Sequence, residues 1–156
     1  MNRRGCLGYD PDLQRHHLIP SQALRTSSLS NMLSSLGKRQ IGFDDFRRNG
    51  MLLPSKEPKA QRMGLPLHRG PHRAYNEMVI ERLGMIEQSW SRQRAVNGER
   101  ANQGALMQIS LLQRALQRRL LDARQPMMLN RKDPLGRGQD FTLLDAMAEQ
   151  LWSATH

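Results

Sequence analysis

Histidines are the residues of this sequence whose spacing indicates chemistry. Four of the five fall into two groups, the adjacent pair His16 and His17 and the pair His68 and His72, four residues apart. Near the start of a helix, two imidazoles at that spacing lie on one side and can share a metal ion. A third nitrogen from the first group would give three protein ligands with open coordination positions, as in metal sites that bind water or substrate. The spacing therefore predicts a metal site.

The adjacent histidines are expected to differ in role. Neighbouring residues of an extended segment point in opposite directions, so His16 and His17 do not both bind the same ion. Imidazole changes its protonation near neutral pH, so the second ring can take a proton from water beside the metal. The residues alone do not decide which ring is the ligand. They also leave open that both groups are ordinary surface or capping histidines.

The first part of the chain is expected to be rich in loops. Five prolines interrupt residues 1–66, and no long helix fits there. The best strand candidates are residues 41–43 and residues 50–53, which would form at most a short hairpin.

Helices dominate the rest of the chain. Pro71 suits the first position of a helix that runs to the break at Asn97 and Gly98. A second helix is predicted over residues 101–124 and a third over residues 140–152. Their apolar residues recur at helical spacing and form the predicted core: Ala74, Met78, Ile86, Trp90, Leu106, Ile109, Leu112, Leu116, Leu120, Leu143, Leu144, Met147 and Leu151.

Composition narrows the fold and the partner. Aromatic residues make up 4% of the 156 residues and valine occurs twice, which argues against a large sheet. We predict a single α+β domain, mostly helical. The net charge is +10, and 20 of the 24 basic residues are arginine, which grips phosphate oxygens with a planar fork. The single cysteine excludes an internal disulfide, and we see no membrane segment and no signal peptide.

Three ordered blocks of sequence resemble a known family. They read QRHHLIP from Gln14, NGMLLP from Asn49 and LHRGPHRAYN from Leu67. This pattern is similar to the AHH branch of the HNH/endonuclease VII nucleases, which commonly occur as C-terminal modules of bacterial polymorphic toxins. The resemblance covers residues 13–83 and implies a ββα-metal catalytic core there, with residues 84–156 as a helical extension.

The resemblance also implies roles for the residues of these blocks. His16, His68 and His72 would bind one divalent metal, with Zn, Mg, Mn and Ni all possible, and His17 would activate the attacking water. Asn49 would match a central asparagine that braces the loop carrying the base. The implied activity is metal-dependent endonuclease hydrolysis of phosphodiester bonds.

Further residues are expected to contact the substrate. Arg69 and Arg73 flank the histidines and are candidates for binding phosphates. Tyr75 and Asn76 match a recurrent pair of the family, and Tyr75 is expected to bind substrate. Arg15 stands where the family has a small Ala or Gly, and it too is a candidate for phosphate contact.

The resemblance extends to substrate, partners and location. It implies nucleic acid as substrate, DNA in preference to RNA, and an acidic immunity protein as partner. It implies a bacterial protein, secreted within a larger toxin or by a dedicated system and active in the target-cell cytoplasm. The alternative is a non-catalytic basic domain that binds nucleic acid or protein and carries a structural metal.

Overall fold

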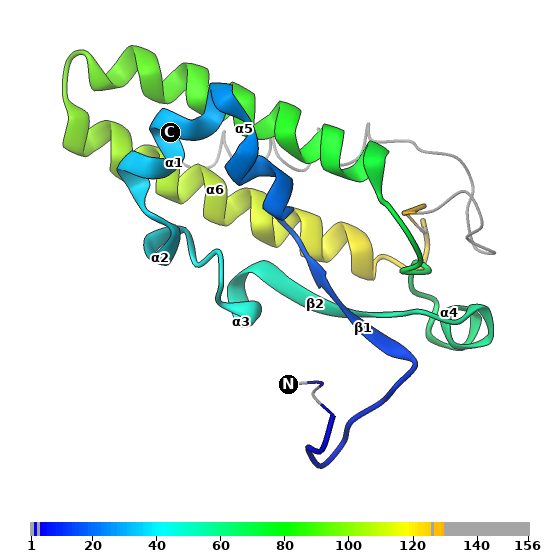
Figure 1. Ribbon diagram of the computed structural model, residues 1–156. Helices are drawn as coiled ribbons and strands as arrows, with labels where there is room; N and C mark the ends of the chain where they lie inside the picture. The colour runs from blue at the N-terminus through cyan, green and yellow to red at the C-terminus, as the bar shows by residue number, and fades with distance from the viewer. Residues whose placement is uncertain (1, 3, 126, 130–156) are drawn as a thin grey trace.

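The computed structural model describes residues 2, 4–125 and 127–129 of the chain (Figure 1). Short elements occupy the first part, and two long helices follow. In order they are β1 (Leu13–His17), the 3-10 turns Ser21–Arg25 and Ser27–Leu29, α1 (Ser30–Leu36), α2 (Lys38–Ile41), α3 (Phe46–Asn49), β2 (Gly50–Pro54), α4 (Glu57–Met63), α5 (Arg73–Arg94) and α6 (Gly98–Leu121). Before residue 66 no helix exceeds seven residues, as predicted.

The sheet consists of β1 and β2, which pair antiparallel with His17 opposite Gly50 and Leu13 opposite Pro54. The predicted strand at residues 50–53 is confirmed. The strand predicted at residues 41–43 is wrong, because Ile41 ends α2 and Gly42 caps that helix in the left-handed region at a φ of 70°. The strand that pairs with β2 is instead β1, a mostly polar segment that ends more than thirty residues before β2 begins.

Helices α5 and α6 lie side by side as an antiparallel pair (Figure 1). The break at Asn97 is confirmed, since its side-chain Oδ1 accepts a hydrogen bond from the Arg100 amide at 2.9 Å and caps α6. Pro71 is not the first helical residue. His72, which follows it, keeps a non-helical backbone, and α5 begins only at Arg73.

The core is apolar and joins α1, α2, β2 and the two long helices. It contains Met32 and Leu36 of α1 and Leu53 of β2. The two long helices contribute most of the predicted stripe residues: Met78, Ile86, Trp90, Ile109, Leu112, Leu116 and Leu120. The predicted fold class, α+β and mostly helical with a small two-stranded sheet, is confirmed.

Two further expectations concern the boundary of the catalytic core and the third predicted helix. Helix α5 runs unbroken through residue 83, where the core was expected to end. The third predicted helix, residues 140–152, lies outside the described residues. Within the described part of the chain, no helix is long and apolar enough to cross a bilayer.

Candidate metal centre

Three segments bring three histidines together. His16 lies within β1, and its side chain is buried. His68 lies in the loop after α4, where its backbone amide donates to the Pro54 carbonyl at 2.7 Å and so ties the loop to the end of β2. Gly70, with a φ of 79°, turns the chain back, and His72 then stands directly before α5. Neither His68 nor His72 is inside the helix, so a glycine turn, and not helical spacing, places them together.

The three imidazoles, which we call the His trio, are close enough to share one ion. The ring centroids of His68 and His72 are 4.5 Å apart. The ring centroid of His16 lies 5.1 Å from that of His68 and 5.7 Å from that of His72. Each ring offers a nitrogen, and these three atoms all lie within 4.8 Å of one another. Two antiparallel strands and the start of a helix thus surround a set of nitrogen donors suited to Zn and other transition metals.

Hydrogen bonds fix which nitrogens can act as ligands. The Nδ1 of His68 lies 3.1 Å from the Gln14 Oε1, and the Nδ1 of His72 lies 3.2 Å from the Leu129 carbonyl oxygen. Carbonyl oxygens only accept, so each neutral ring carries its hydrogen on Nδ1 and keeps a lone pair on Nε2. The Nε2 of His16 is buried without a hydrogen-bond partner. A buried nitrogen of this kind is costly unless something binds it, and a metal ion satisfies it.

The electrostatics of the site keep the His trio neutral. Burial, reinforced by repulsion from His68 and His72, lowers the pKa of His16 to about 3. Burial, and then His72, lowers the pKa of His68 to about 4. Burial also lowers the pKa of His72, against the effect of its bond to Leu129. Neutral imidazole is the form that binds metal, so these residues are ready ligands near neutral pH.

His17 lies outside the His trio. It is exposed at the end of β1, and strand alternation places it on the face opposite to Gln14 and His16. Arg15 shares that face, with its guanidinium 4.4 Å above the centroid of the Phe46 ring. The Phe46 ring lies against β2 at Gly50, where an added Cβ would come within 2.1 Å of it. Gly50 is the residue paired with His17 in the sheet, and because it has no side chain the Phe46 ring can occupy the space beside it.

Asn49 braces the segment that follows His17. It is fully buried, its Oδ1 accepts from the Ile19 amide at 2.8 Å, and its Nδ2 donates to the Ile19 carbonyl at 3.2 Å. The Leu18 amide donates to the Asn49 carbonyl at 3.1 Å. Because its side chain is enclosed and bonded within the protein, Asn49 is a positioning residue that does not touch substrate.

Tyr75 is not placed to bind substrate, contrary to the sequence-based expectation. Its side chain is 1% exposed, and its hydroxyl donates to the Leu18 carbonyl at 2.7 Å. The ring meets that of His16 edge to face, with centroids 4.9 Å apart. Burial raises the pKa of Tyr75 far above its usual value. The residue therefore supports the His trio from inside the core.

The basic candidates are exposed. Arg69 and Arg73 immediately follow His68 and His72, and both side chains are open to solvent. Arg69 also lines a hollow of about 620 Å³ beside His68, together with Gln14 and Lys56. A phosphate chain approaching the His trio would meet positive charge there.

Sequence reasoning missed three contributors to the site. Gln14 lies two residues before His16, so strand alternation would have placed it beside the ligand. Gln113 is 3% exposed on α6, and its Nε2 donates to the Asn49 Oδ1 at 3.3 Å. A signal for it exists, because Gln113 occupies a position of the apolar stripe, four residues after Ile109. Leu129 acts through its backbone, which no residue type could have revealed.

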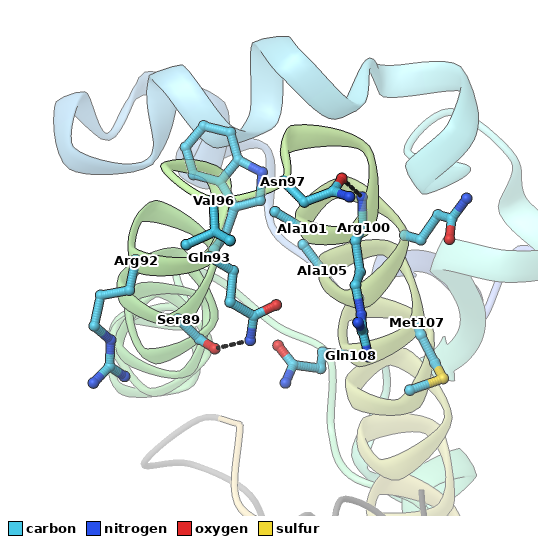
Figure 2. Close-up of a pocket in the computed structure, with 13 residues that line it drawn as sticks. Ser89, Arg92, Gln93, Val96, Asn97, Arg100, Ala101, Ala105, Met107 and Gln108 are labelled. Atoms are coloured by element: carbon cyan, nitrogen blue, oxygen red, sulfur yellow. Dashed lines mark hydrogen bonds between the residues drawn. The ribbon is translucent and has the colours of Figure 1, made fainter. Parts of the chain in front are cut away.

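A larger hollow, of about 910 Å³, lies between the last turns of α5 and the first turns of α6, at the end of α5 away from His72 (Figure 2). Arg92, Gln93, Arg100 and Met107 are among the residues that line it. None of the described residues around this hollow is a histidine, cysteine, aspartate or glutamate. It therefore lacks the groups for acid–base or metal chemistry, and the His trio remains the candidate centre.

Two strands, a following helix and a histidine cluster that could hold one metal ion are the features of a ββα domain with a candidate metal centre. Comparison with known families identifies it further: the model of the AHH family, a nuclease family of the HNH/ENDO VII superfamily with conserved AHH, matches residues 1–116. The chain belongs to this family and is a nuclease, so its substrate is nucleic acid. At the first position of the AHH pattern it carries Arg15. No curated protein and no solved structure matches the chain significantly.

Proposed function

We propose that this nuclease is a metal-dependent endonuclease that hydrolyses phosphodiester bonds of DNA. The observation that carries the proposal is the His trio, in which His68 and His72 keep a free Nε2 and the Nε2 of His16 is buried without a partner. Three protein ligands leave coordination positions for water and a phosphate oxygen. A bound divalent ion would supply charge stabilisation on the phosphate oxygens.

Residues of the chain carry the other tasks. We assign the role of general base to His17, because it is exposed at the end of β1 and directly follows a proposed ligand. Since the two side chains leave opposite faces of the strand, the substrate must approach at the end of β1, where both faces can be reached. Asn49 and Tyr75 hold Ile19 and Leu18, the residues after His17, and thereby fix the end of the strand that carries the base. Arg69 and Arg73 bind phosphates that flank the cleaved bond, and Arg15 binds phosphate on the His17 face of the sheet.

DNA is preferred to RNA as the substrate. The net charge of +10, mostly from arginine, suits a dense phosphate backbone. Aromatic residues are 4% of the chain, which leaves little material for the base-stacking surfaces that bind single strands and RNA. The resemblance to nucleases that mostly cut DNA supports the same choice.

A non-catalytic domain with a structural metal is the competing function. Structural metal sites are closed by four protein ligands. In the part of the chain that the structure describes, the cluster comprises three histidines and no further ligating side chain. The proposed function accounts for this ligand set better.

The biological role we infer is that of a bacterial toxin module. It would be secreted within a larger toxin or by a dedicated system and would act in the target-cell cytoplasm. A cognate immunity protein would be acidic, since it must bind a domain of net charge +10. The support is the resemblance to toxin modules, and induced expression in a bacterial cytoplasm tests it. Rapid loss of viability is expected, and unimpaired growth with the active protein present would contradict the role.

Incubation with nucleic acid tests the activity. Supercoiled plasmid and an RNA of similar length are incubated with the protein after metal removal and then with Zn, Mg, Mn or Ni added singly. We expect nicked and linear plasmid with at least one metal, none with excess chelator, and slower loss of RNA. Intact plasmid with every metal would overturn the proposal. Faster loss of RNA than of plasmid would show that RNA is the preferred substrate.

A further inference from the structure

The segment that follows α6 returns to the His trio. The family match ends at residue 116, within α6. Beyond it the structure describes residues 117–125 and 127–129, and residues 127–129 lie beside the start of α5 (Figure 1). We call residues 122–125 and 127–129 the return segment. Its position is thus a feature of this chain outside the part that the family pattern covers.

The return segment touches one ligand directly. The His72 Nδ1 donates to the Leu129 carbonyl oxygen, with 3.2 Å between the two atoms. His68 makes the equivalent hydrogen bond to the side chain of Gln14, a residue of β1. A neutral imidazole carries its hydrogen on one of two nitrogens, and the acceptor that it finds decides which. Leu129 therefore selects the His72 tautomer whose Nε2 is free.

Two kinds of contact hold the return segment in place. Met127 and Leu129 are 3% and 4% exposed and belong to the hydrophobic core. Arg119 of α6 is itself 5% exposed, and its Nη1 donates to the Gln125 carbonyl. A buried guanidinium needs such partners, so this bond ties Arg119 to the return segment.

We propose that the return segment is a positioning element of the metal centre, in which the Leu129 carbonyl sets the tautomer and orientation of His72 and Arg119 holds the segment against it. The proposal rests on the proposed function in taking the His trio as the metal site. Its central claim, the tautomer, concerns the metal-free protein. A hydrogen-bond acceptor behind a ligating histidine raises metal affinity, because the tautomer and the orientation of the ring are already fixed before the metal binds.

The variants are made in the full chain and come as matched pairs. Leu129→Asp places a carboxylate in an apolar site and expels the segment, because a buried unpaired charge is costly. Leu121→Asp makes the same change at a leucine that is 51% exposed. Arg119→Met removes the donor to Gln125, and Arg118→Met makes the same change at the neighbouring residue of the same helix.

The first readout is the His72 tautomer, from nitrogen chemical shifts of the metal-free protein at pH 8. We expect the hydrogen on Nδ1 in the parent protein and in both control variants. In Leu129→Asp and Arg119→Met we expect a shift toward hydrogen on Nε2. A parent protein with the hydrogen on Nε2 would overturn the proposal whatever the variants do. Thermal melting identifies a variant that fails to fold, and the other variant then decides.

The second readout is Zn²⁺ affinity by calorimetry. Leu129→Asp and Arg119→Met should bind Zn²⁺ about 10- to 100-fold more weakly, and the controls within about twofold of the parent. Folded variants with parental tautomer and affinity would overturn the proposal. Because neither readout involves cleavage, an inactive parent protein with the expected tautomer would refute the nuclease mechanism and leave the positioning role supported.

Discussion

The chain up to His72 and the α5–α6 helix pair solve different physical problems. The first region consists of elements of three to seven residues, and all three proposed ligands and the proposed base lie in it. Buried polar contacts fix it, such as those of Asn49 with Ile19. The helix pair is held by apolar stripes, and the hollow between its ends contains no ligating group among the described residues that line it. Chemistry is thus placed on short irregular elements, and the long helices provide the rigid surface behind them.

The helix pair nevertheless reaches the site through polar side chains. Tyr75 of α5 bonds to Leu18, and Gln113 of α6 bonds to Asn49. Both of these contacts end on positioning groups and not on the ligand nitrogens. The division therefore predicts that changes in the first region alter chemistry, and that changes in the apolar stripes of the helices alter stability first.

The largest effect is expected from His68→Ala. Loss of one of three ligands should abolish detectable plasmid nicking. It should also weaken Zn²⁺ binding by more than loss of a hydrogen-bond acceptor behind a ligand does, for which we expect about 10- to 100-fold. The gain in melting temperature on adding metal should disappear as well, because that gain comes from binding to the folded state. Calorimetry and thermal melting measure both. Parental metal binding would show that the site lies elsewhere.

His17→Ala should separate the base from the ligands. We expect nicking to fall by about 100- to 10,000-fold, since a general base is removed, while Zn²⁺ affinity stays near the parental value. Nicking rates and calorimetry on the same preparation check this. Weakened Zn²⁺ binding would mean that His17 is a ligand, and parental nicking would remove it from the mechanism.

Ile109→Ala tests the helix pair. Ile109 is 1% exposed at the centre of the α6 stripe, so the cavity should lower the free energy of unfolding by about 2 to 5 kcal/mol. Metal affinity of the folded protein should stay parental. Met107→Ala, at a side chain that is 45% exposed, is the control and should change stability by about 0.5 kcal/mol or less. Denaturant titration gives both values, and a large loss of Zn²⁺ affinity in folded Ile109→Ala would contradict the division.

Arg15→Ala should have the smallest effect and restores the residue of the AHH pattern. It leaves the ligands and the base in place and removes a cation that lies over Phe46. In a His17→Ala background, DNA affinity should fall and the slope of log affinity against log salt should decrease by about 1. Equilibrium titration across a salt series measures this. An unchanged slope would show that Arg15 does not contact phosphate.

Local sequence patterns predicted what local physics controls. The two long helices, the break at Asn97 and the strand at residues 50–53 follow from apolar spacing, capping and turn residues. The clustering of histidines and the family blocks predicted a metal site, and the geometry brings His16, His68 and His72 as close together as that prediction requires. Strand β1 was missed because its sequence is mostly polar, and its pairing with β2 is a long-range contact.

The sequence by itself determined the residue types of the site, the adjacency of His16 and His17, and the helical scaffold. Only the tertiary structure decided which faces meet: that Tyr75 is enclosed beneath His16, that Gln113 reaches Asn49, and that the Leu129 carbonyl accepts from His72. The reason is physical. Helix periodicity and capping act between neighbours in the chain, whereas a buried hydrogen bond depends on where packing brings a donor and an acceptor together, and backbone acceptors are the same in every residue.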